Sequence, residues 1–533
     1  SFYQWVDSLI LGAPLFVCME HDPWSLRRRD VLRAGASATA VAALGTTAGA
    51  SDAGTTAGTA PASSTAYAPR GQVDIDGAAE AVVAPDGETA FVAVGSGFVS
   101  VDVSDPANPT VVGEAAGLQS PDGENVREVL DVKYDDGQVL VPTAAQGGGP
   151  RGFYLYDVTD PANPTQVGDW FATPEHGIHN AALVDGVAYL TTSFTLEIDI
   201  VDVSGDSFER LATWEPGDWN EDWARPRNAP LHDLYVQDGV AYCAYWDAGV
   251  FVVDVSDPAN PSFVSRVGEY TLEENQELTQ SAYIEPGGNA HYVTVNEDAS
   301  LLAEGGESWD IDPNDDSGGP SGITFYDITD VANPERVGHV DPPVSRSNAY
   351  RGGTWTTSHN FQLRNDRLYA SWYQGGVSIH DVSDPANPER LAWWASPTER
   401  AFWTAQLAKP GEFFVASSYA SSAMSARATP GLLTFPDVAG EMAEQPSEVA
   451  WTREELAARA PKTTTESTTT TTAATTTEPT TAEPTTSMPD EEPTATEDGA
   501  TGSTPGFGVL AALAGLGVGA SRLLRGRDDD TGR

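Results

Sequence analysis

A short pattern of alternating apolar and polar positions recurs along this chain and ends in a proline-rich turn. It is clearest at residues 249–261, which read Gly-Val-Phe-Val-Val-Asp-Val-Ser-Asp-Pro-Ala-Asn-Pro. Seven copies occupy residues 97–109, 152–164, 196–204, 249–261, 322–334, 376–388 and 431–437, the third and last being shorter and weaker. Alternating β-branched and aromatic residues predict a strand. Asp-Pro and Asn-Pro then end it, because proline supplies no ladder N–H and restricts the residue before it.

The spacing of the copies predicts the architecture. From Asp105 to Asp160 is 55 residues, and from Asp330 to Asp384 is 54. A period of roughly 50 residues with several short strands is typical of four-stranded propeller blades. From Asp257 to Asp330 is 73 residues, so an insertion is expected in that repeat.

A hairpin precedes the repeated strand in most copies. Residues 179–193, 232–245 and 359–372 each place a two-residue turn between apolar runs, with Asp-Gly in the first two. Each repeat therefore predicts four strands. Residues 72–76 match the fourth strand alone, and no fourth strand follows the seventh copy. We expect this segment to complete the last blade, giving an all-β, seven-bladed β-propeller closed by an N-terminal strand.

The repeated Asp-Val-Ser-Asp-Pro-Ala-Asn-Pro pattern resembles the LVIVD repeat family of secreted or surface proteins. The resemblance covers roughly residues 71–442, in one register throughout. It implies a β-propeller fold and an extracellular location, and it implies no particular reaction.

The N-terminal region, residues 1–50, has the features of an export signal. Arg28 and Arg29 stand in a charged stretch that precedes the Ala- and Gly-rich residues 34–50. This resembles a twin-arginine signal peptide, which implies contact with export machinery and cleavage near Ala50. An amphipathic helix is the alternative. We expect translation to begin at Met19, with residues 1–18 as an upstream extension; an N-terminal membrane segment is the other possibility.

The C-terminal region predicts a stalk and an anchor. Residues 443–462 form a short helix and linker, with Thr452 and Glu455 as a capping box. Residues 463–504 are a Thr-rich, disordered stalk. Residues 505–533 begin with Pro505, Gly506 and Phe507, continue with an apolar stretch and then carry an arginine cluster. This resembles a PGF-CTERM sorting signal, which implies recognition by an archaeosortase and attachment to the membrane. A tail anchor that stays in place is the alternative.

The charge changes the picture of the environment. Asp and Glu number 78 against 28 Lys and Arg, a net charge of −50. An acidic chain with ample aromatic residues suits a salt-adapted, halophilic archaeon, because salt screens self-repulsion. The same charge argues against nucleic-acid partners, which need basic patches. Of the two cysteines, Cys18 precedes the expected cleavage site, and Cys243 is expected in a buried strand.

Histidines are the main candidates for chemistry. Aligned on the hairpin glycine, the position seven residues upstream holds Glu80, Leu130, His179, His232, Gln280, His359 and Thr404. His179, His232 and His359, joined by His176, are expected at one mouth of the channel. There they could bind a transition metal such as Zn²⁺, Cu²⁺ or Fe²⁺, oriented by the Asn or Asp that follows each. The alternative is that they only hydrogen-bond neighbouring blades. His291 and His380 are expected to be structural.

Two insertions offer further candidates. Asp310, Asp312, Asn314 and Asp316 alternate as calcium-loop ligands do, although the loop glycine and the twelfth-position Glu are missing; a solvated acidic loop is the alternative. Residues 214–227 place three tryptophans beside charged groups, either to contact a glycan or protein or to be buried.

The sequence contains no nucleophile elbow and no phosphate loop. It therefore predicts an extracellular protein, anchored to the cell surface by its C-terminus. This protein would act as a binding or scaffolding module of the archaeal cell envelope, with an envelope protein or glycan as ligand. The alternative is a metal-dependent enzyme with a histidine-lined site at the channel mouth.

Overall fold

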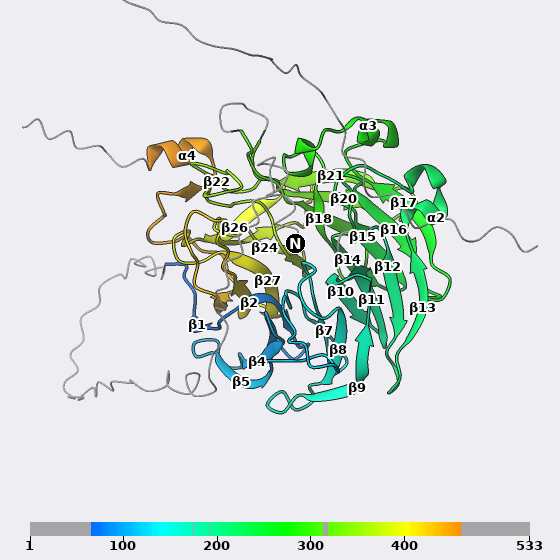
Figure 1. Cartoon of the computed structure of the whole chain (residues 1–533). Coiled ribbons are helices and arrows are strands. Elements are labelled where there is room, and N and C mark those ends of the chain that lie inside the picture. Colours follow the sequence, from blue (N-terminus) through cyan, green and yellow to red (C-terminus); the bar gives the residue numbers. More distant parts are fainter. Residues whose placement is uncertain (1–65, 174, 193–194, 313–317, 460–533) are drawn as a thin grey trace, which may run out of the picture. The chain divides into compact units, whose positions relative to one another are not determined.

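A computed structural model describes residues 66–173, 175–192, 195–312 and 318–459. Within these residues, seven four-stranded antiparallel sheets surround a common centre as the blades of a propeller (Figure 1). The predicted seven-bladed, all-β propeller is confirmed. The predicted export signal, stalk and sorting segment lie outside the described residues.

The blades are numbered 1 to 7 along the chain. Each blade has four strands, which are described here from the innermost, next to the channel, to the outermost. The innermost strands are β2 (Ala78–Val83), β6 (Lys133–Asp135), β10 (Ile178–Val184), β14 (Asp233–Gln237), β18 (Ala290–Val295), β23 (Phe361–Arg364) and β27 (Phe402–Lys409). The second strands are β3 (Thr89–Val94), β7 (Gln138–Pro142), β11 (Val187–Thr192), β15 (Val240–Ala244), β19 (Leu301–Gly306), β24 (Arg367–Ser371) and β28 (Phe413–Ser418).

The repeated sequence pattern forms the third strand of every blade. These strands are β4 (Phe98–Asp102), β8 (Gly152–Asp157), β12 (Ile198–Asp202), β16 (Val250–Asp254), β20 (Ile323–Asp327), β25 (Val377–Asp381) and β29 (Gly431–Pro436). The outer strands are β5 (Thr110–Ala115), β9 (Thr165–Ala172), β13 (Glu209–Trp214), β17 (Ser262–Val267), β21 (Glu335–Val340), β26 (Glu389–Trp394) and β1 (Gly71–Asp74).

The N-terminal strand closes the ring, as predicted. In blade 7, β1 pairs antiparallel with β29, with Gly71 opposite Thr434 and Asp74 opposite Gly431. The Thr434 hydroxyl also accepts a hydrogen bond of 3.0 Å from the Gly71 N–H. Residues more than 350 positions apart thus share one sheet, and β1 pairs with the edge that β29 would otherwise expose.

The repeated turn is stabilised by its own aspartates. In blade 1, Asp102 accepts hydrogen bonds from the backbone and hydroxyl of Ser104, at 2.9 and 2.6 Å. Asp105 accepts from the Ala107 N–H and the Asn108 amide. This is the local side-chain bonding that favours Asp and Asn in turns. Most third strands begin at or just after a glycine, which is required for a different reason. At Gly249, with φ of 80°, a Cβ would lie 2.2 Å from the Val267 carbonyl oxygen.

Apolar side chains pack between neighbouring blades. Between blades 3 and 4, for example, Ile200 and Phe251 share a buried cluster with Cys243. Burial raises the pKa of the Cys243 thiol. The cysteine therefore occupies the buried strand position that the sequence predicts.

The two ends of the propeller differ strongly. We call the end at which the innermost strands begin the mouth face, and the opposite end the turn face. Connections on the turn face are at most seven residues long, as at 103–109 and 255–261. Several connections on the mouth face are longer, and two of them are residues 268–289 and 307–322. The predicted single insertion is therefore two insertions, and both are on the mouth face.

Short helices occur in these longer connections and at the end of the described chain. They are α2 (Pro216–Trp219), η2 (Glu221–Trp223), α3 (Leu272–Glu277), η3 (Ser281–Tyr283) and α4 (Arg453–Ala458). None of the helices in the described part of the chain is long and apolar enough to cross a membrane.

The described chain ends on the mouth face. After β29, Gly440 donates its N–H to Leu391 beside the outer strand of blade 6. Further on, β30 (Val449–Ala450) pairs with β22 (Val344–Ser345), and α4 follows (Figure 1). Thr452 caps α4 by accepting from the Glu455 N–H, as predicted. The Glu455 carboxylate accepts from the Trp451 N–H.

Candidate metal centre at the channel mouth

The strand register corrects the sequence alignment of the innermost strands. Ala181 lies opposite Leu190, Leu234 opposite Cys243, and Val293 opposite Glu304. Aligned on these pairs, the position two residues earlier, here called the histidine layer, holds Ala79, Leu130, His179, His232, His291, His359 and Trp403. The next position, here called the polar layer, holds Glu80, Asp131, Asn180, Asp233, Tyr292, Asn360 and Thr404.

Three sequence assignments were therefore wrong. Glu80 and Thr404 belong to the polar layer, because the hairpins of blades 1 and 7 are longer than the two-residue turns of blades 2, 3, 4 and 6. Gln280 precedes η3 in a mouth-face connection and is not part of β18. His291 takes its place, because the blade 5 hairpin spans residues 296–300 and contains no glycine on which to align.

Three of the four histidines in the layer donate Nδ1–H to a backbone carbonyl of an adjacent blade. His179 Nδ1 is 2.8 Å from the Ala145 oxygen, and His232 Nδ1 is 3.0 Å from the His291 oxygen. His359 Nδ1 is 2.8 Å from the Trp403 oxygen. Because a carbonyl can only accept, Nδ1 must carry the proton, and Nε2 of each neutral ring presents a lone pair.

These Nε2 atoms converge. The Nε2 atoms of His179 and His232 are 2.9 Å apart. The four rings follow one another around the channel, with centroids 4.4 Å apart from His179 to His232 and 4.0 Å apart from His232 to His291. The last step, from His291 to His359, is 4.5 Å. Histidines from blades 3 to 6 thus form one continuous arc.

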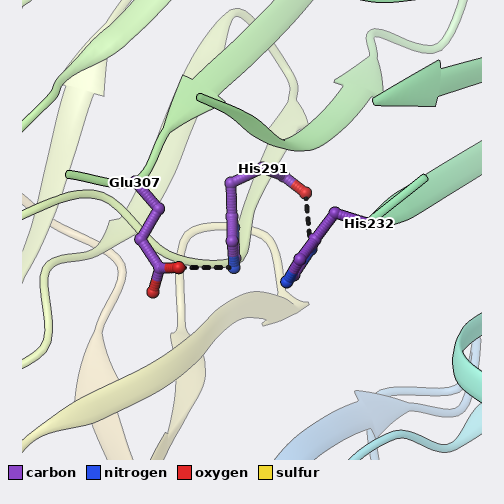
Figure 2. A group of neighbouring side chains, drawn as sticks. All are labelled: His232, His291 and Glu307. Atoms are coloured by element: carbon purple, nitrogen blue, oxygen red, sulfur yellow. Dashed lines mark hydrogen bonds and ion pairs between the residues drawn. The ribbon is translucent and has the colours of Figure 1, made fainter. Parts of the chain in front are cut away.

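A carboxylate completes the group. Glu307 follows β19 directly, and its Oε2 lies 3.6 Å from His291 Nε2 (Figure 2). Its Oε1 accepts a hydrogen bond of 2.5 Å from the Tyr373 hydroxyl. His232, His291 and Glu307 each offer one ligand atom within 4.8 Å of the others. Figure 2 shows the three side chains in a row, with His291 between the other two.

The backbone at the mouth is strained. Tyr373 and Trp246 occupy equivalent positions just after their blades' second strands, with φ of 47° and 42°. Positive φ is a true outlier for bulky residues and costs about 1–3 kcal/mol each. The Tyr373 ring contacts His359, with centroids 4.6 Å apart, and Trp246 contacts His232 at 5.4 Å. The two strained residues therefore pack directly against histidines of the layer.

Burial shifts the pKa values of these groups in the directions that favour their neutral forms. Desolvation lowers the pKa of His359 to about 3 and holds the pKa values of His232 and His291 well below the ordinary range. Neighbouring imidazoles add to the effect on His232 and His291. Burial raises the pKa of Glu307 to about 8. The site thus holds neutral imidazoles, which are the form that binds metals.

A small cavity lies among these side chains. Its lining includes His179, His232, His291, Glu307 and His359. The free volume is about 10 Å³, which is the room of a single water molecule or ion.

The polar layer beneath is organised around Lys133. Its Nζ lies 2.6 Å from Asp131 Oδ1 and 3.6 Å from Glu80 Oε1. Glu80 also accepts hydrogen bonds from the Asn360 amide and the Thr404 hydroxyl, at 2.5 and 2.7 Å. Burial raises the pKa of Glu80 to about 7, although Lys133 opposes the shift.

The other predicted site residues do not join the centre. His176 is exposed, and its backbone carbonyl accepts from Thr173. Asp310 is partly buried and Asp312 exposed, while Asn314 and Asp316 lie outside the described residues, so the calcium prediction stays a prediction. Arg28, Arg29, Pro505, Gly506 and Phe507 also lie outside the described residues.

The tryptophan-rich insertion packs against blade 4. Trp214 and Trp223 are buried, and Arg266 lies over the Trp223 ring at 4.5 Å. Trp219 remains 44% exposed and stacks on Phe263 with centroids 3.7 Å apart. Two of the three rings are thus part of the core, and one is available at the surface.

Sequence reasoning missed His291, Glu307 and Tyr373. The signal for His291 was present, since it begins an alternating strand as the other three histidines do. Glu307 and Tyr373 carry no such signal. Acidic residues are common in this chain, and both side chains reach the site only because they follow the second strand of a blade.

Comparison with known proteins supports the repeat. The LVIVD repeat model matches residues 76–116 and 231–268, which correspond to blades 1 and 4. No curated protein matches the sequence. Among solved structures, the β-propeller domain of Cps50 (Swd1) from Myceliophteria thermophila matches with 8% identity and a TM-score of 0.46, covering 69% of this chain and 99% of that one. A chain of the mitotic checkpoint complex matches with 12% identity and a TM-score of 0.44, covering 73% and 100%.

The protein is therefore a seven-bladed β-propeller that contains LVIVD repeats. Such a fold suggests a binding or scaffolding module, and the function itself must be argued from its sites.

Proposed function

We propose that this chain is an exported binding module of an archaeal cell envelope, anchored by its C-terminus, which takes a protein or glycan ligand on the mouth face. The observation that carries this proposal is the unequal length of the connections at the two ends. Among the described connections that join strands of the seven blades, every one longer than seven residues is on the mouth face. Loops on a rigid scaffold are where binding residues concentrate.

Sequence features support export and anchoring. Arg28 and Arg29 would engage a twin-arginine export route, and Pro505, Gly506 and Phe507 would mark the tail for an archaeosortase. The Thr-rich residues 463–504 would carry the propeller away from the membrane as a stalk. The net charge of −50 suits a salt-rich exterior.

Location can be tested in a halophilic archaeal host that expresses the full chain. External protease should remove the propeller from intact cells. An Arg28→Lys and Arg29→Lys double variant should be retained inside the cell. A Pro505→Ala, Gly506→Ala, Phe507→Ala variant should lose its stable attachment. Intracellular wild-type protein would contradict the proposal.

Binding can be mapped with a single attached polymer. In a chain that carries Cys18→Ser, the remaining Cys243 is buried, so a maleimide polyethylene glycol will react selectively with one engineered surface thiol. Glu273→Cys places the polymer on the mouth face, and Ala107→Cys places it on the turn face, since both residues are exposed. The modified Glu273→Cys protein should lose binding to the host's isolated envelope, and the modified Ala107→Cys protein should keep it. The reverse pattern would place the ligand on the turn face.

A metal-dependent enzyme at the mouth is the second candidate. It is favoured by the gathering of Glu307 and the histidines around one small cavity, which has room for a metal ion or a water molecule. Chelator-sensitive hydrolysis of an activated ester by the wild-type chain, absent from a His232→Asn variant, would support it. Equal rates for the two proteins would exclude this activity.

A further inference from the structure

We infer that the histidine layer and Glu307 form a binding site for one divalent transition-metal ion of the Zn²⁺, Co²⁺, Cu²⁺ or Fe²⁺ class. The inference concerns the channel itself and does not depend on export, anchoring or the ligand of the mouth face.

The first argument is the hydrogen-bonding state of the rings. Carbonyl acceptors fix the protons of His179 and His232 on Nδ1. Their Nε2 atoms then both lie on the inner side of the rings and approach each other to 2.9 Å. A cation at this point would be bound by both nitrogen atoms. A hydrogen bond from ring N–H to a carbonyl is also the usual way in which a protein orients a metal-binding histidine.

The second argument is the kind of donor gathered in one place. Four imidazoles and one carboxylate come from the layer and the adjoining second strand of blade 5. Nitrogen donors with a single carboxylate select borderline transition metals, whereas calcium and magnesium prefer sites built from oxygen. The site therefore depends on its imidazole nitrogens and does not follow from the large number of acidic residues in the chain.

The third argument is spacing. Donors bound to one ion at 2.0–2.2 Å can be at most about 4.4 Å apart. The donor atoms of His232, His291 and Glu307 lie within 4.8 Å of one another. An ion would therefore draw these side chains inward by only a few tenths of an ångström, and the cavity of about 10 Å³ gives it room.

The fourth argument is an unsatisfied atom. His291 Nδ1 is buried and has no hydrogen-bond partner, and His291 itself is only 2% exposed. Buried polar groups are nearly always satisfied, so an exception calls for an explanation. His291 lies between His232 and Glu307 (Figure 2), so an ion held among these three side chains would lie beside its ring.

The alternative, that the histidines only join blades, explains half of the geometry. The three Nδ1 bonds do cross from one blade to the next. They leave unexplained why the Nε2 atoms converge and why His291 makes no such bond through Nδ1. Both features follow if the inner nitrogens hold an ion.

The test uses the full chain, stripped with a chelator and refilled in concentrated salt. Zn²⁺ and Co²⁺ are titrated by calorimetry, and Co²⁺ is also followed by visible absorption, which reports its coordination geometry. His232→Asn removes Nε2 but keeps an amide N–H where Nδ1 donates to the His291 carbonyl, so the variant is expected to fold. Glu307→Gln keeps an acceptor for the Tyr373 hydroxyl.

Wild type should bind one equivalent of Zn²⁺ or Co²⁺ and unfold at a higher temperature when loaded, because the ligand binds only the folded state. His232→Asn should weaken binding by at least about 100-fold, more than the loss of an outer-shell partner causes. Glu307→Gln should weaken it less and change the Co²⁺ spectrum.

His380→Asn is the matched control. His380 is also a buried imidazole, but it lies in β25 against Trp451, outside the layer. It should bind metal as wild type does. A folded wild type without stoichiometric binding would overturn the inference, as would undiminished binding by folded His232→Asn.

Discussion

The histidine layer and the polar layer are built from adjacent residues of the same seven strands, yet they treat buried polarity differently. In the polar layer, the Lys133 ammonium contacts the carboxylates of Asp131 and Glu80. In the histidine layer, neutral rings turn lone pairs toward one another, and His291 Nδ1 has no partner. The Lys133 cluster thus supplies its own counter-charge, although Asp233 Oδ2 and Asn360 Oδ1 in the same layer also lack hydrogen-bond partners. The converging Nε2 atoms of the histidine layer call for a cation from outside.

The difference teaches which part of a buried polar cluster is structural. A buried polar group whose hydrogen bonds and counter-charge come from the protein stabilises the fold. A buried polar group without such partners destabilises it, so its presence indicates another role. The strained Tyr373 and Trp246 border the histidine layer, which is where strain at functional sites is usually found. The comparison predicts that the polar layer will respond to mutation through stability and the histidine layer through metal binding.

Lys133→Met should have the largest effect on stability. Removing the ammonium leaves the buried carboxylates of Asp131 and Glu80 without their counter-charge, and breaking such a pair costs about 3–5 kcal/mol. Denaturant unfolding near neutral pH in constant salt measures the loss. The difference from wild type should shrink in acid, where the Glu80 carboxylate, whose pKa burial raises to about 7, is protonated.

Lys409→Met is the matched control for that variant. Lys409 pairs with Glu88 at 3.0 Å, but both groups are more exposed than the Lys133 cluster. A pair of this kind is worth about 1 kcal/mol or less. Equal losses in the two variants would show that the polar layer is not the stabilising element we describe.

Most of the fold, but only part of the site, could be read from the sequence. The seven repeated third strands, their turns and the closure by β1 could be predicted because each repeat contains the same local sequence pattern. The hydrogen bonds of Asp102 and Asp105 in the turn are an example. The layer assignment depended on hairpin length, which varies between blades. His291 was therefore missed although its local pattern was visible.

Glu307 and Tyr373 could not be found by pattern at all. Their side chains reach the channel because of the backbone direction just after a second strand, and Tyr373 takes a φ that no sequence rule assigns to tyrosine. Such residues become visible only when blades 5 and 6 are placed side by side. Periodicity reports which residues are buried in a sheet, and the site is formed by residues at the ends of sheets.

Glu307→Gln should stabilise the metal-free protein at alkaline pH. The pKa of Glu307 is raised to about 8 from a reference of 4.5, so between these values the folded protein holds a proton that the unfolded chain has released. Stability therefore falls as pH rises through this window. Gln carries no charge to desolvate, and at pH 8.5 the variant should exceed wild type by about 4–5 kcal/mol, with no advantage at pH 4.

Glu304→Gln separates this effect from metal binding. Glu304 is also buried in blade 5, accepts from the Tyr326 hydroxyl at 3.1 Å and has a pKa raised to about 7. It should give a similar gain at high pH while leaving metal affinity unchanged. In chelated samples both variants should flatten the pH profile. A Glu307→Gln profile that still falls between pH 5 and pH 8 as wild type does would show that another group controls it.

His291→Leu should have the smallest effect on the metal-free protein. The Nδ1 atom of His291 has no partner to lose, and leucine fills a similar volume, so the change in unfolding free energy should stay within about 1 kcal/mol. By contrast, His380→Leu gives up a 3.0 Å hydrogen bond to the Ser378 hydroxyl and should cost about 1–2 kcal/mol. Loaded with metal, the order should reverse, since His291→Leu loses the stabilisation by the ion and His380→Leu keeps it. Chemical unfolding of both variants, with and without Zn²⁺, measures all four values. If His291→Leu proved the more damaging change without metal, the histidine layer would be structural after all, because its imidazoles would then stabilise the fold without a cation.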